Sequence, residues 1–339
     1  MASGYSHILI TKWVRDALPG VNEELDNIID AGQYLFQLGA VAPDLPYASI
    51  ADGDLFLSNE SKVADFFHYY HTNQIPLRAL DKLKNTDNID FKYAAFAFFT
   101  GYLSHVIIDG LVHPFVRDMV GDYEQNQAAH RSLEMAIDVL LYDYFTRDSG
   151  EADNLRAANL YKELKSVDEE TYKMQIFELF SYLICNIYSD EMKKEKLKQK
   201  DVNSKKIDGW KNGLMTLFKV AETNVPRIYF IEKLQNSFFF QDSNEVLNDP
   251  EKYLLLTPEK VQGNDNKIFN NSTQIHFIND ILPKIADVLT EALQISYNYV
   301  FENGPRPTEI TIPQINLDTG RSLAVNGGKN LNEMVKLWS

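Results

Sequence analysis

The feature that most constrains this chain is a long apolar segment that carries its few polar residues at helical spacing. Residues 93–116 hold a single formal charge, Asp109. His105 and His113 lie four positions before and after it, and in an α-helix of about 3.6 residues per turn such positions share one face. An unpaired imidazole or carboxylate in such surroundings costs on the order of a few kcal/mol. The sequence therefore predicts a helix whose polar stripe is satisfied by hydrogen-bonding partners or by bound cations.

The same segment is long and apolar enough for a membrane-spanning helix, judged by composition alone. Four polar residues in its middle and end, Ser104, His105, Asp109 and His113, argue against that interpretation. No second apolar run of similar length accompanies it. We therefore expect no transmembrane segment, and a buried helix at the centre of a helical domain.

The next predicted helix repeats the arrangement. In the stretch HRSLEMAID, His130, Glu134 and Asp138 are again four apart, with apolar residues between them. Two neighbouring helices thus offer an imidazole followed one turn later by a carboxylate. Six of the seven histidines precede residue 135, and His276 is the exception.

Further candidates lie upstream of these helices. His7 stands near the start of the chain, Asp44 lies in a turn bounded by prolines, and His68 and His71 follow an aromatic stretch. Imidazole nitrogen and carboxylate oxygen are ligands of zinc and similar divalent ions, and a single cysteine excludes a thiolate-rich site. The candidate metal ligands are His7, Asp44, His68, His105, Asp109, His113, His130 and Glu134. They are too many for one tetrahedral ion, which indicates two or three ions.

In this order, these residues resemble the zinc-dependent phospholipase C family, whose all-helical fold is shared with the fungal single-strand-specific nucleases. The matching pieces are the early histidine, GAVAPD, DFFHYY, HVIID, a histidine near a proline, and HRSLE, and they cover residues 5–140. The resemblance implies an all-α fold, a multi-helix bundle of the phospholipase C and single-strand nuclease type, with a trinuclear zinc site.

The resemblance also implies how the ligands are shared among the ions. One ion would be held by Asp44, His68, His105 and Asp109, a second by His113, His130 and Glu134, and a third by His7 with a bridging Asp109. Within DFFHYYH the family pattern favours His68 over His71. Classical secreted members bind the third ion through an N-terminal tryptophan, whereas this chain begins MASGYSH. Two or three Zn²⁺ ions are therefore expected.

The expected chemistry is hydrolysis of a phosphodiester by metal-activated water. The resemblance implies that Asp44 orients the attacking water or takes its proton. A small phosphodiester or a phospholipid is the expected substrate. Two alternatives remain open: an enzyme of a specialised pathway that uses the same zinc scaffold for different hydrolytic or lyase chemistry, and a non-catalytic metal-binding protein.

Charge and targeting signals narrow the choice of partner and compartment. The chain has 33 basic and 48 acidic side chains, a formal net charge of −15, and no basic stripe. Extended nucleic-acid binding requires such a stripe to neutralise phosphates, so no nucleic acid is expected as a partner. The first residues lack the pattern of an export signal, which predicts a cytoplasmic protein; the alternative is an exported protein whose leader is missing from this sequence.

The chain is expected to form one helical metallo-domain over residues 1–305 and a tail over residues 306–339. Residues 1–150 carry the ligands, and helices in residues 151–305 complete the bundle. The tail alternates weakly between polar and apolar residues, which is typical of a small hairpin.

Aromatic residues gather near the proposed ligands. They either line a pocket for an acyl chain or headgroup, or pack in the core, as aromatic residues at helical spacing usually do. This group comprises Tyr47, Phe66, Phe67, Tyr69 and Tyr70.

Overall fold

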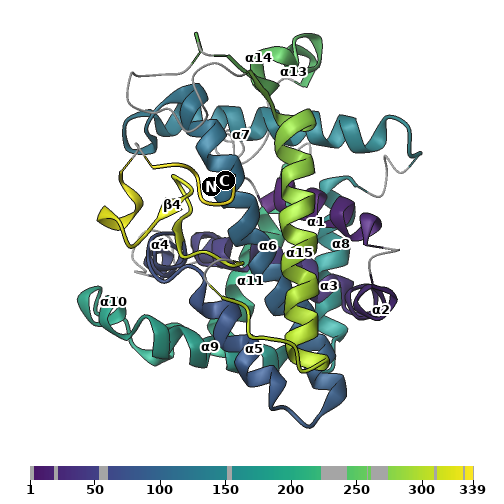
Figure 1. The fold of residues 1–339 in the computed structure, drawn as a ribbon, viewed down its shortest axis with the longest axis vertical. Coiled ribbons are helices and arrows are strands. Elements are labelled where there is room, and N and C mark those ends of the chain that lie inside the picture. The colour runs from purple at the N-terminus through teal and green to yellow at the C-terminus, as the bar shows by residue number, and fades with distance from the viewer. Residues whose placement is uncertain are drawn as a thin grey trace.

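The computed structural model describes residues 4–18, 22–52, 60–150, 155–222, 243–257, 259–260, 274–308, 311–330 and 333–338. They form a bundle of helices with two pairs of very short antiparallel strands (Figure 1). The predicted all-α fold is therefore confirmed. The longer helices are α1 (Gly4–Ala17), α2 (Glu23–Ala31), α3 (Gln33–Val41), α4 (Ser61–Tyr69), α5 (Gln74–Lys84), α6 (Ile89–Val120), α7 (Tyr123–Thr146), α8 (Ala157–Ser166), α9 (Lys173–Ile187), α11 (Ser204–Glu222) and α15 (Leu282–Phe301).

Shorter elements connect these helices. They are the 3₁₀ helices η1 (Ala42–Asp52), η2 (Val167–Glu169), η3 (Gln199–Asp201) and η5 (Asn326–Gly328), the helices α10 (Ser189–Lys194), α13 (Ser243–Asn248) and α14 (Glu251–Leu254), the π-helical turn η4 (Phe277–Ile281), and the strands β1 (Leu255–Leu256), β2 (Ile275–His276), β3 (Ile315–Asn316) and β4 (Arg321–Ser322).

Helix α6 is the centre of the molecule. It begins where the Asn88 side chain accepts a hydrogen bond from the Phe91 N–H, and it ends at Gly121, whose φ of 90° suits glycine. Helices α1, α3, α5, α7 and α15 pack around it. Its most apolar 18-residue window is long enough to cross a membrane by composition but is 100% buried inside the fold. The segment is thus a core helix, as its polar residues predicted.

Helices α3 and α6 approach so closely that only glycine fits at two crossing points. A Cβ atom on Gly39 would lie 2.0 Å from the Phe98 carbonyl oxygen, and one on Gly101 would lie 2.1 Å from the Phe36 carbonyl oxygen. Backbone therefore packs on backbone at this crossing. The contact sets the position of η1, which follows α3 directly and carries Asp44.

The turn between α6 and α7 sends the chain back toward the polar stripe of α6. Asp122 caps α7 by accepting a hydrogen bond from the Glu124 N–H, and a kink at Asn126 (φ −131°, ψ 33°) bends the first turns. After the kink, His130 and Glu134 are buried on the inner face of α7.

The predicted C-terminal hairpin is confirmed. Strands β3 and β4 pair Ile315 with Ser322 and Asn316 with Arg321, and Gly320 in the intervening turn has a φ of 65°. In Figure 1 this yellow segment lies beside α4.

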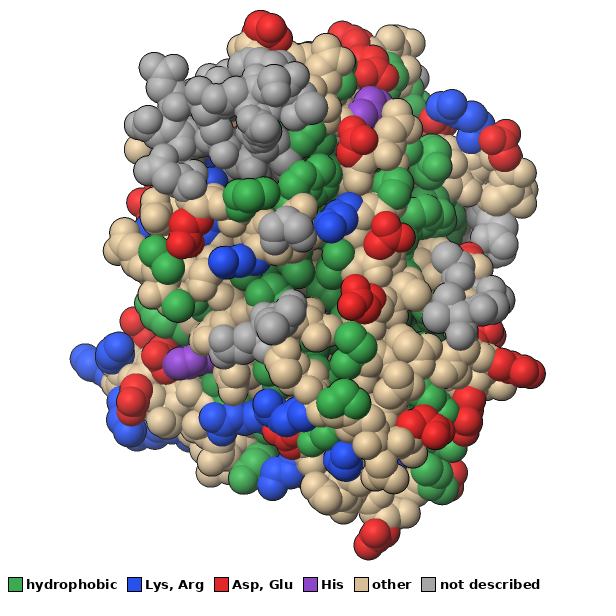
Figure 2. All heavy atoms as spheres, in the orientation of Figure 1, with side chains coloured by type: hydrophobic (Ala, Val, Ile, Leu, Met, Phe, Trp, Pro, Cys, Tyr) green, Lys and Arg blue, Asp and Glu red, His purple; other side chains and the backbone are tan. Residues whose placement is uncertain are grey.

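Charged side chains cover much of the outside. On the face shown in Figure 2, Lys and Arg gather mainly at the lower left, while Asp and Glu are scattered along the other edges, with apolar side chains visible between them. The described part of this face has no continuous basic stripe.

Candidate metal centre

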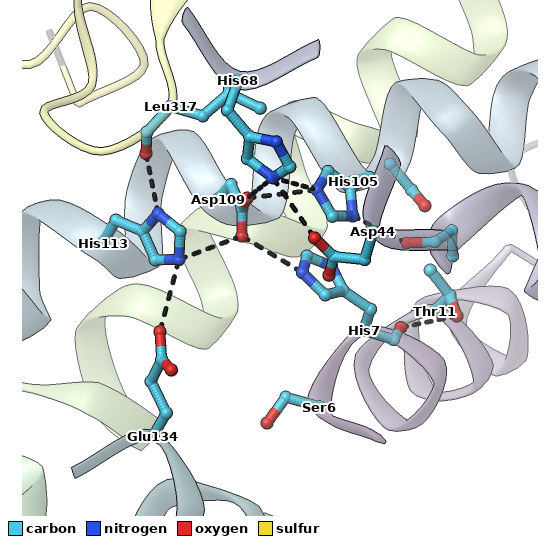
Figure 3. A network of polar contacts seen from close by, with 12 residues as sticks. Ser6, His7, Thr11, Asp44, His68, His105, Asp109, His113, Glu134 and Leu317 are labelled. Atoms are coloured by element: carbon cyan, nitrogen blue, oxygen red, sulfur yellow. Dashed lines mark hydrogen bonds and ion pairs between the residues drawn. The ribbon is translucent and has the colours of Figure 1, made fainter. Parts of the chain in front are cut away.

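The structure brings all eight candidate ligands into one buried cluster, and Figure 3 labels all of them except His130. They come from five elements: His7 from α1, Asp44 from η1, His68 from α4, His105, Asp109 and His113 from α6, and His130 and Glu134 from α7. Five segments thus converge because α1, η1 and α7 pack on the central helix α6 and α4 packs on η1. Asp44 is the most exposed of the eight at 7%, and His68 follows at 4%.

Asp109 is the hub of this cluster. Its Oδ1 lies 3.1 Å from His7 Nε2 and 3.4 Å from His113 Nε2. Its Oδ2 lies 3.1 Å from His105 Nε2 and 3.4 Å from His68 Nε2. One fully buried carboxylate therefore faces four imidazole rings, as Figure 3 shows.

Backbone carbonyls fix the orientation of two of these rings, those of His68 and His105. Nδ1 of His68 donates to the Ala64 carbonyl oxygen at 2.7 Å, and Nδ1 of His105 donates to the Ala40 carbonyl oxygen at 2.9 Å. Because a carbonyl only accepts, the ring proton stays on Nδ1, and a neutral ring presents a bare Nε2 to the cluster. This is the arrangement in which histidine binds a metal through Nε2.

Two rings and two carboxylates, those of His68, His105, Asp109 and Asp44, turn their inner atoms toward one another. All of these atoms are acceptors when the rings are neutral. Nε2 of His68 and Nε2 of His105 lie 3.3 Å apart, and both face Asp109 Oδ2. His68 Nε2 also lies 3.3 Å from Asp44 Oδ1. Lone pairs that point at one another repel unless a cation or a proton lies between them. The donor set therefore fits a divalent ion held by nitrogen and oxygen.

A second group of donors lies beside α7. Glu134 Oε1 is 3.2 Å from His130 Nε2 and 3.5 Å from His113 Nε2. The rings of His113 and His130 meet edge to face with centroids 5.6 Å apart. This group is connected to the first through His113, which also faces Asp109.

Donor atoms within 4.8 Å of one another form three groups in the described chain. They are His7 with His105 and Asp109, Asp44 with His68 and His105, and His113 with His130 and Glu134. The last matches the set implied by the family resemblance. The first two share His105, whereas the resemblance assigned His105 to the Asp44 ion alone.

Several buried polar atoms of the cluster lack an ordinary hydrogen bond. Within the described residues this holds for both ring nitrogens of His7 and of His130, although Nε2 of each ring lies beside a carboxylate of the cluster. A buried polar atom without a partner is costly, and native structures satisfy nearly all of them. Metal coordination would satisfy these atoms, which is a second indication that the cluster suits cations.

Burial and neighbouring charges shift the pKa values of the cluster in different directions: two histidine rings become less basic and one becomes more basic. Burial lowers the pKa of His105 and of His130, which favours the neutral rings that can coordinate a metal. Burial alone would raise the pKa of Asp109, but the charges of His113, His105 and His7 outweigh it and hold that pKa well below its usual value. Burial alone would lower the pKa of His68, but hydrogen bonds to Asp109 and Asp44 raise it to about 10. Without another cation, a proton on His68 supplies the positive charge that the carboxylates require.

Two histidines lie outside the cluster. His71 follows the end of α4, has a φ of 48° and is exposed, and its Nδ1 lies 3.2 Å from Gln314 Nε2. The geometry thus agrees with the preference for His68. His276 caps the π-helical turn η4 by accepting from the N–H groups of Ile278 and Asn279.

The aromatic residues near the cluster divide into core and rim. Phe66 and Phe67 are buried in the core, and Tyr70 is 46% exposed. Tyr47 and Tyr69 are half-buried, with ring centroids 5.9 Å and 6.4 Å from that of His68. Of these five aromatic residues, only Tyr47 and Tyr69 lie against the ring of His68, which with Asp44 is the most exposed part of the cluster.

Sequence reasoning missed two residues that contact the cluster. Tyr123 meets the His130 ring edge to face at a centroid distance of 5.0 Å. The carbonyl oxygen of Leu317, in the C-terminal tail, accepts a hydrogen bond from His113 Nδ1 at 3.0 Å. A backbone carbonyl has no sequence signature, so only the structure could identify it.

Comparison with known proteins agrees with this geometry. A family model described as zinc dependent phospholipase C matches residues 6–194, which hold all eight candidate ligands. Searches for similar curated proteins and for similar solved structures found no match. The matched range spans more than half of the sequence, and the chain therefore belongs to the zinc-dependent phospholipase C family.

Proposed function

We propose that the protein is a zinc-dependent phosphoric diester hydrolase that cleaves a small phosphodiester or a phospholipid. The observation that carries this proposal is the convergence of five buried imidazoles and three carboxylates around Asp109, with their inward atoms all able to coordinate a cation. Membership in the zinc-dependent phospholipase C family supports the same conclusion. The proposed metal ligands are His7, Asp44, His68, His105, Asp109, His113, His130 and Glu134.

The number of ions depends on His105. Its Nδ1 is engaged by the Ala40 carbonyl, so only Nε2 can bind a metal, and one lone pair binds one ion. The two donor groups that share His105 therefore cannot both use it. Together with the group around Glu134, these donors would hold two or three ions, with Asp109 among the ligands.

Bound zinc would supply Lewis acidity, which acidifies water and neutralises charge on a phosphodiester oxygen. Asp44 is the ligand nearest to solvent, and its second carboxylate oxygen could orient a water or accept its proton. The charges of His105 and His68 outweigh burial and keep the pKa of Asp44 below its usual value, so the carboxylate is ionised at neutral pH. It is thus in the form that can accept a hydrogen bond from a water.

The rim suggests a substrate with a compact polar group beside the phosphate. Tyr47 donates a hydrogen bond to Asp65 at 2.8 Å, which places a carboxylate and two half-buried tyrosine rings, Tyr47 and Tyr69, near His68. Such a rim offers both ring faces and oxygen acceptors. Small or lipid phosphodiesters fit this description better than long polyanions, given the net charge of −15.

The first test is elemental analysis of the purified protein after dialysis against metal-free buffer. We expect two or three zinc ions per chain and hydrolysis of a nitrophenyl phosphodiester or of phosphatidylcholine. Full zinc content without turnover of either substrate would favour different chemistry on the same scaffold. Absence of bound zinc, with the histidines satisfied by protein partners, would contradict the proposal.

Replacement of the hub gives a sharper test. In Asp109→Asn the bridging oxygens lose their charge, so we expect loss of at least one zinc per chain and a fall in turnover of more than about 100-fold, beyond what loss of a supporting residue causes. The matched control is Glu60→Gln, which also replaces a buried carboxylate by its amide but at a site that bonds Trp210. Full zinc and turnover in Asp109→Asn would show that the hub is assigned wrongly.

A further inference from the structure

The C-terminal tail reaches two of the proposed ligands through the backbone of a single residue. The N–H of Leu317 donates to the His68 carbonyl oxygen at 3.0 Å. The carbonyl oxygen of Leu317 accepts from His113 Nδ1, also at 3.0 Å, as Figure 3 shows. Residue 317 therefore bridges α4 and α6 at the level of the candidate metal centre.

This contact decides which nitrogen of His113 faces the cluster. With its proton held on Nδ1 by Leu317, the ring presents a bare Nε2 to Glu134 and Asp109. His68 and His105 are oriented by carbonyls of Ala64 and Ala40, which lie in the range matched by the family model. The acceptor for His113 comes from 204 residues away and from outside that range.

Side chains from the turn after α4 and from α6 hold the tail in place on both sides of Leu317. The Thr72 hydroxyl donates to the Ile315 carbonyl oxygen at 2.7 Å and accepts from the Ile315 N–H at 3.2 Å. One turn beyond His113, Arg117 Nη1 donates to Asp318 Oδ2 at 2.6 Å. Leu317 is thus held in place by contacts at Ile315, two positions before it, and at Asp318, one position after it.

Helix α6 is shaped to receive the tail on this face. A Cβ atom on Gly110 would lie 2.4 Å from Ile315 Cδ1, and one on Gly320 would lie 2.6 Å from the Gly110 carbonyl oxygen. Pro114 has no N–H to donate to that Gly110 carbonyl, so the helix leaves it free of its usual partner at the point where the hairpin turn packs. Gly110, His113 and Arg117 share one face of α6, which is the face that the tail covers.

We propose that residues 315–320 form a clamp that positions His113 as a metal ligand, with Leu317 as the positioning residue. This inference rests on the proposed metal-binding function. It assigns the tail a selective role: the clamp supports the ion held by His113, His130 and Glu134, whereas the rings of His68 and His105 have anchors of their own.

The test uses two single variants of the full chain that loosen the clamp without touching a ligand. Thr72→Val removes both hydrogen bonds to Ile315, and Asp318→Asn weakens the pair with Arg117. Each has a matched control: Thr100→Val, whose buried hydroxyl bonds only to its own helix at Phe96 and Ala97, and Asp208→Asn, which pairs with Lys173 and Lys211.

Zinc per chain and stepwise zinc affinities are measured by competition with a chromophoric chelator, and cobalt substitution reports the ligand geometry of each ion by its visible spectrum. We expect one of the bound ions to lose about 10- to 100-fold in affinity in Thr72→Val and Asp318→Asn, as is usual when a residue that orients a ligand is lost. The remaining ion or ions keep wild-type affinity, and both controls keep all of them.

Thermal unfolding of each variant separates this role from general destabilisation. If the affinity for every ion fell equally, in proportion to a lower melting temperature, the tail would only stabilise the fold. That result would contradict the proposed clamp. So would unchanged affinities in both variants. Wild-type protein that binds no zinc would instead contradict the proposed function itself, so the two failures are distinguishable.

Discussion

At the scale of single residues, the cluster is a problem of charge compensation. Five imidazoles and three carboxylates are nearly or fully buried together, and burial of charge without compensation is expensive. Two solutions exist, namely metal ions between neutral rings or protons on some of the rings. The rise in the pKa of His68 to about 10 corresponds to the second solution, in which this ring carries a proton.

The two solutions predict different dependence of stability on pH. A folded-state pKa of about 10 for His68 lies above the unfolded value of 6.5, so the stabilisation is fully present below about pH 6.5 and disappears as the pH rises through 10. Chelator-treated protein should therefore lose on the order of 3 kcal/mol of unfolding free energy between pH 7 and pH 10. Urea unfolding at several pH values measures this.

Zinc-saturated protein should show a much flatter profile over the same range, because the ions keep His68 deprotonated throughout. His71→Gln is the control, since that exposed ring lies outside the cluster. A flat profile for the chelator-treated protein would mean that His68 carries no proton in the folded state.

At the scale of elements, the crossing of α3 and α6 positions the site. The Ala40 carbonyl that orients His105 follows Gly39 directly, and Gly39 and Gly101 form the tight crossing. Any increase in the distance between the two helices would move the carbonyl away from the ring. Packing and ligand geometry are therefore coupled at this point.

Gly101→Ala tests this coupling. The added methyl group would overlap the Phe36 carbonyl, so we expect a loss of about 1–3 kcal/mol in unfolding free energy, together with weaker zinc binding as Ala40 shifts. Chemical unfolding and chelator competition measure the two effects.

Gly4→Ala is the control, because a Cβ atom there meets its nearest neighbour at an ordinary 3.5 Å. It should be neutral or slightly stabilising, as alanine is the better helix former. Wild-type stability in Gly101→Ala would show that the helices can separate at no cost.

At the scale of the whole molecule, bound ions would act as cross-links. The proposed ligands come from α1, η1, α4, α6 and α7, and the tail contacts two of them, so metal binding ties together both ends of the described chain. A ligand that binds only the folded state stabilises it by mass action.

We therefore expect zinc to raise the melting temperature and a chelator to lower it. Free zinc at about 100 times its dissociation constant would add about 2.7 kcal/mol per ion. Calorimetry with and without chelator measures the shift, and Asp109→Asn should show a much smaller one. An identical melting temperature in both conditions would argue that zinc does not bind the native state.

Much of the candidate site could be predicted because helices are local structures. A spacing of four puts His105, Asp109 and His113 on one face whatever surrounds them, and their apolar neighbours require that face to be buried. The same reasoning located His130 and Glu134 on the next helix. The choice of His68 came from the order of motifs in the family, and the end of α4 provides the physical reason: His71 lies beyond the helix.

The sequence by itself determined the central apolar helix and the residue types of a candidate nitrogen and oxygen metal centre, because these depend on periodicity and on side-chain chemistry, and its resemblance to a family implied the all-helical class. Only the tertiary structure decided that Asp109 is the hub, that two donor groups compete for His105, and that a carbonyl of the tail orients His113. Those features depend on which backbone and side-chain atoms meet across distant segments. No pattern along the chain encodes the position of a backbone carbonyl relative to a ring 204 residues away.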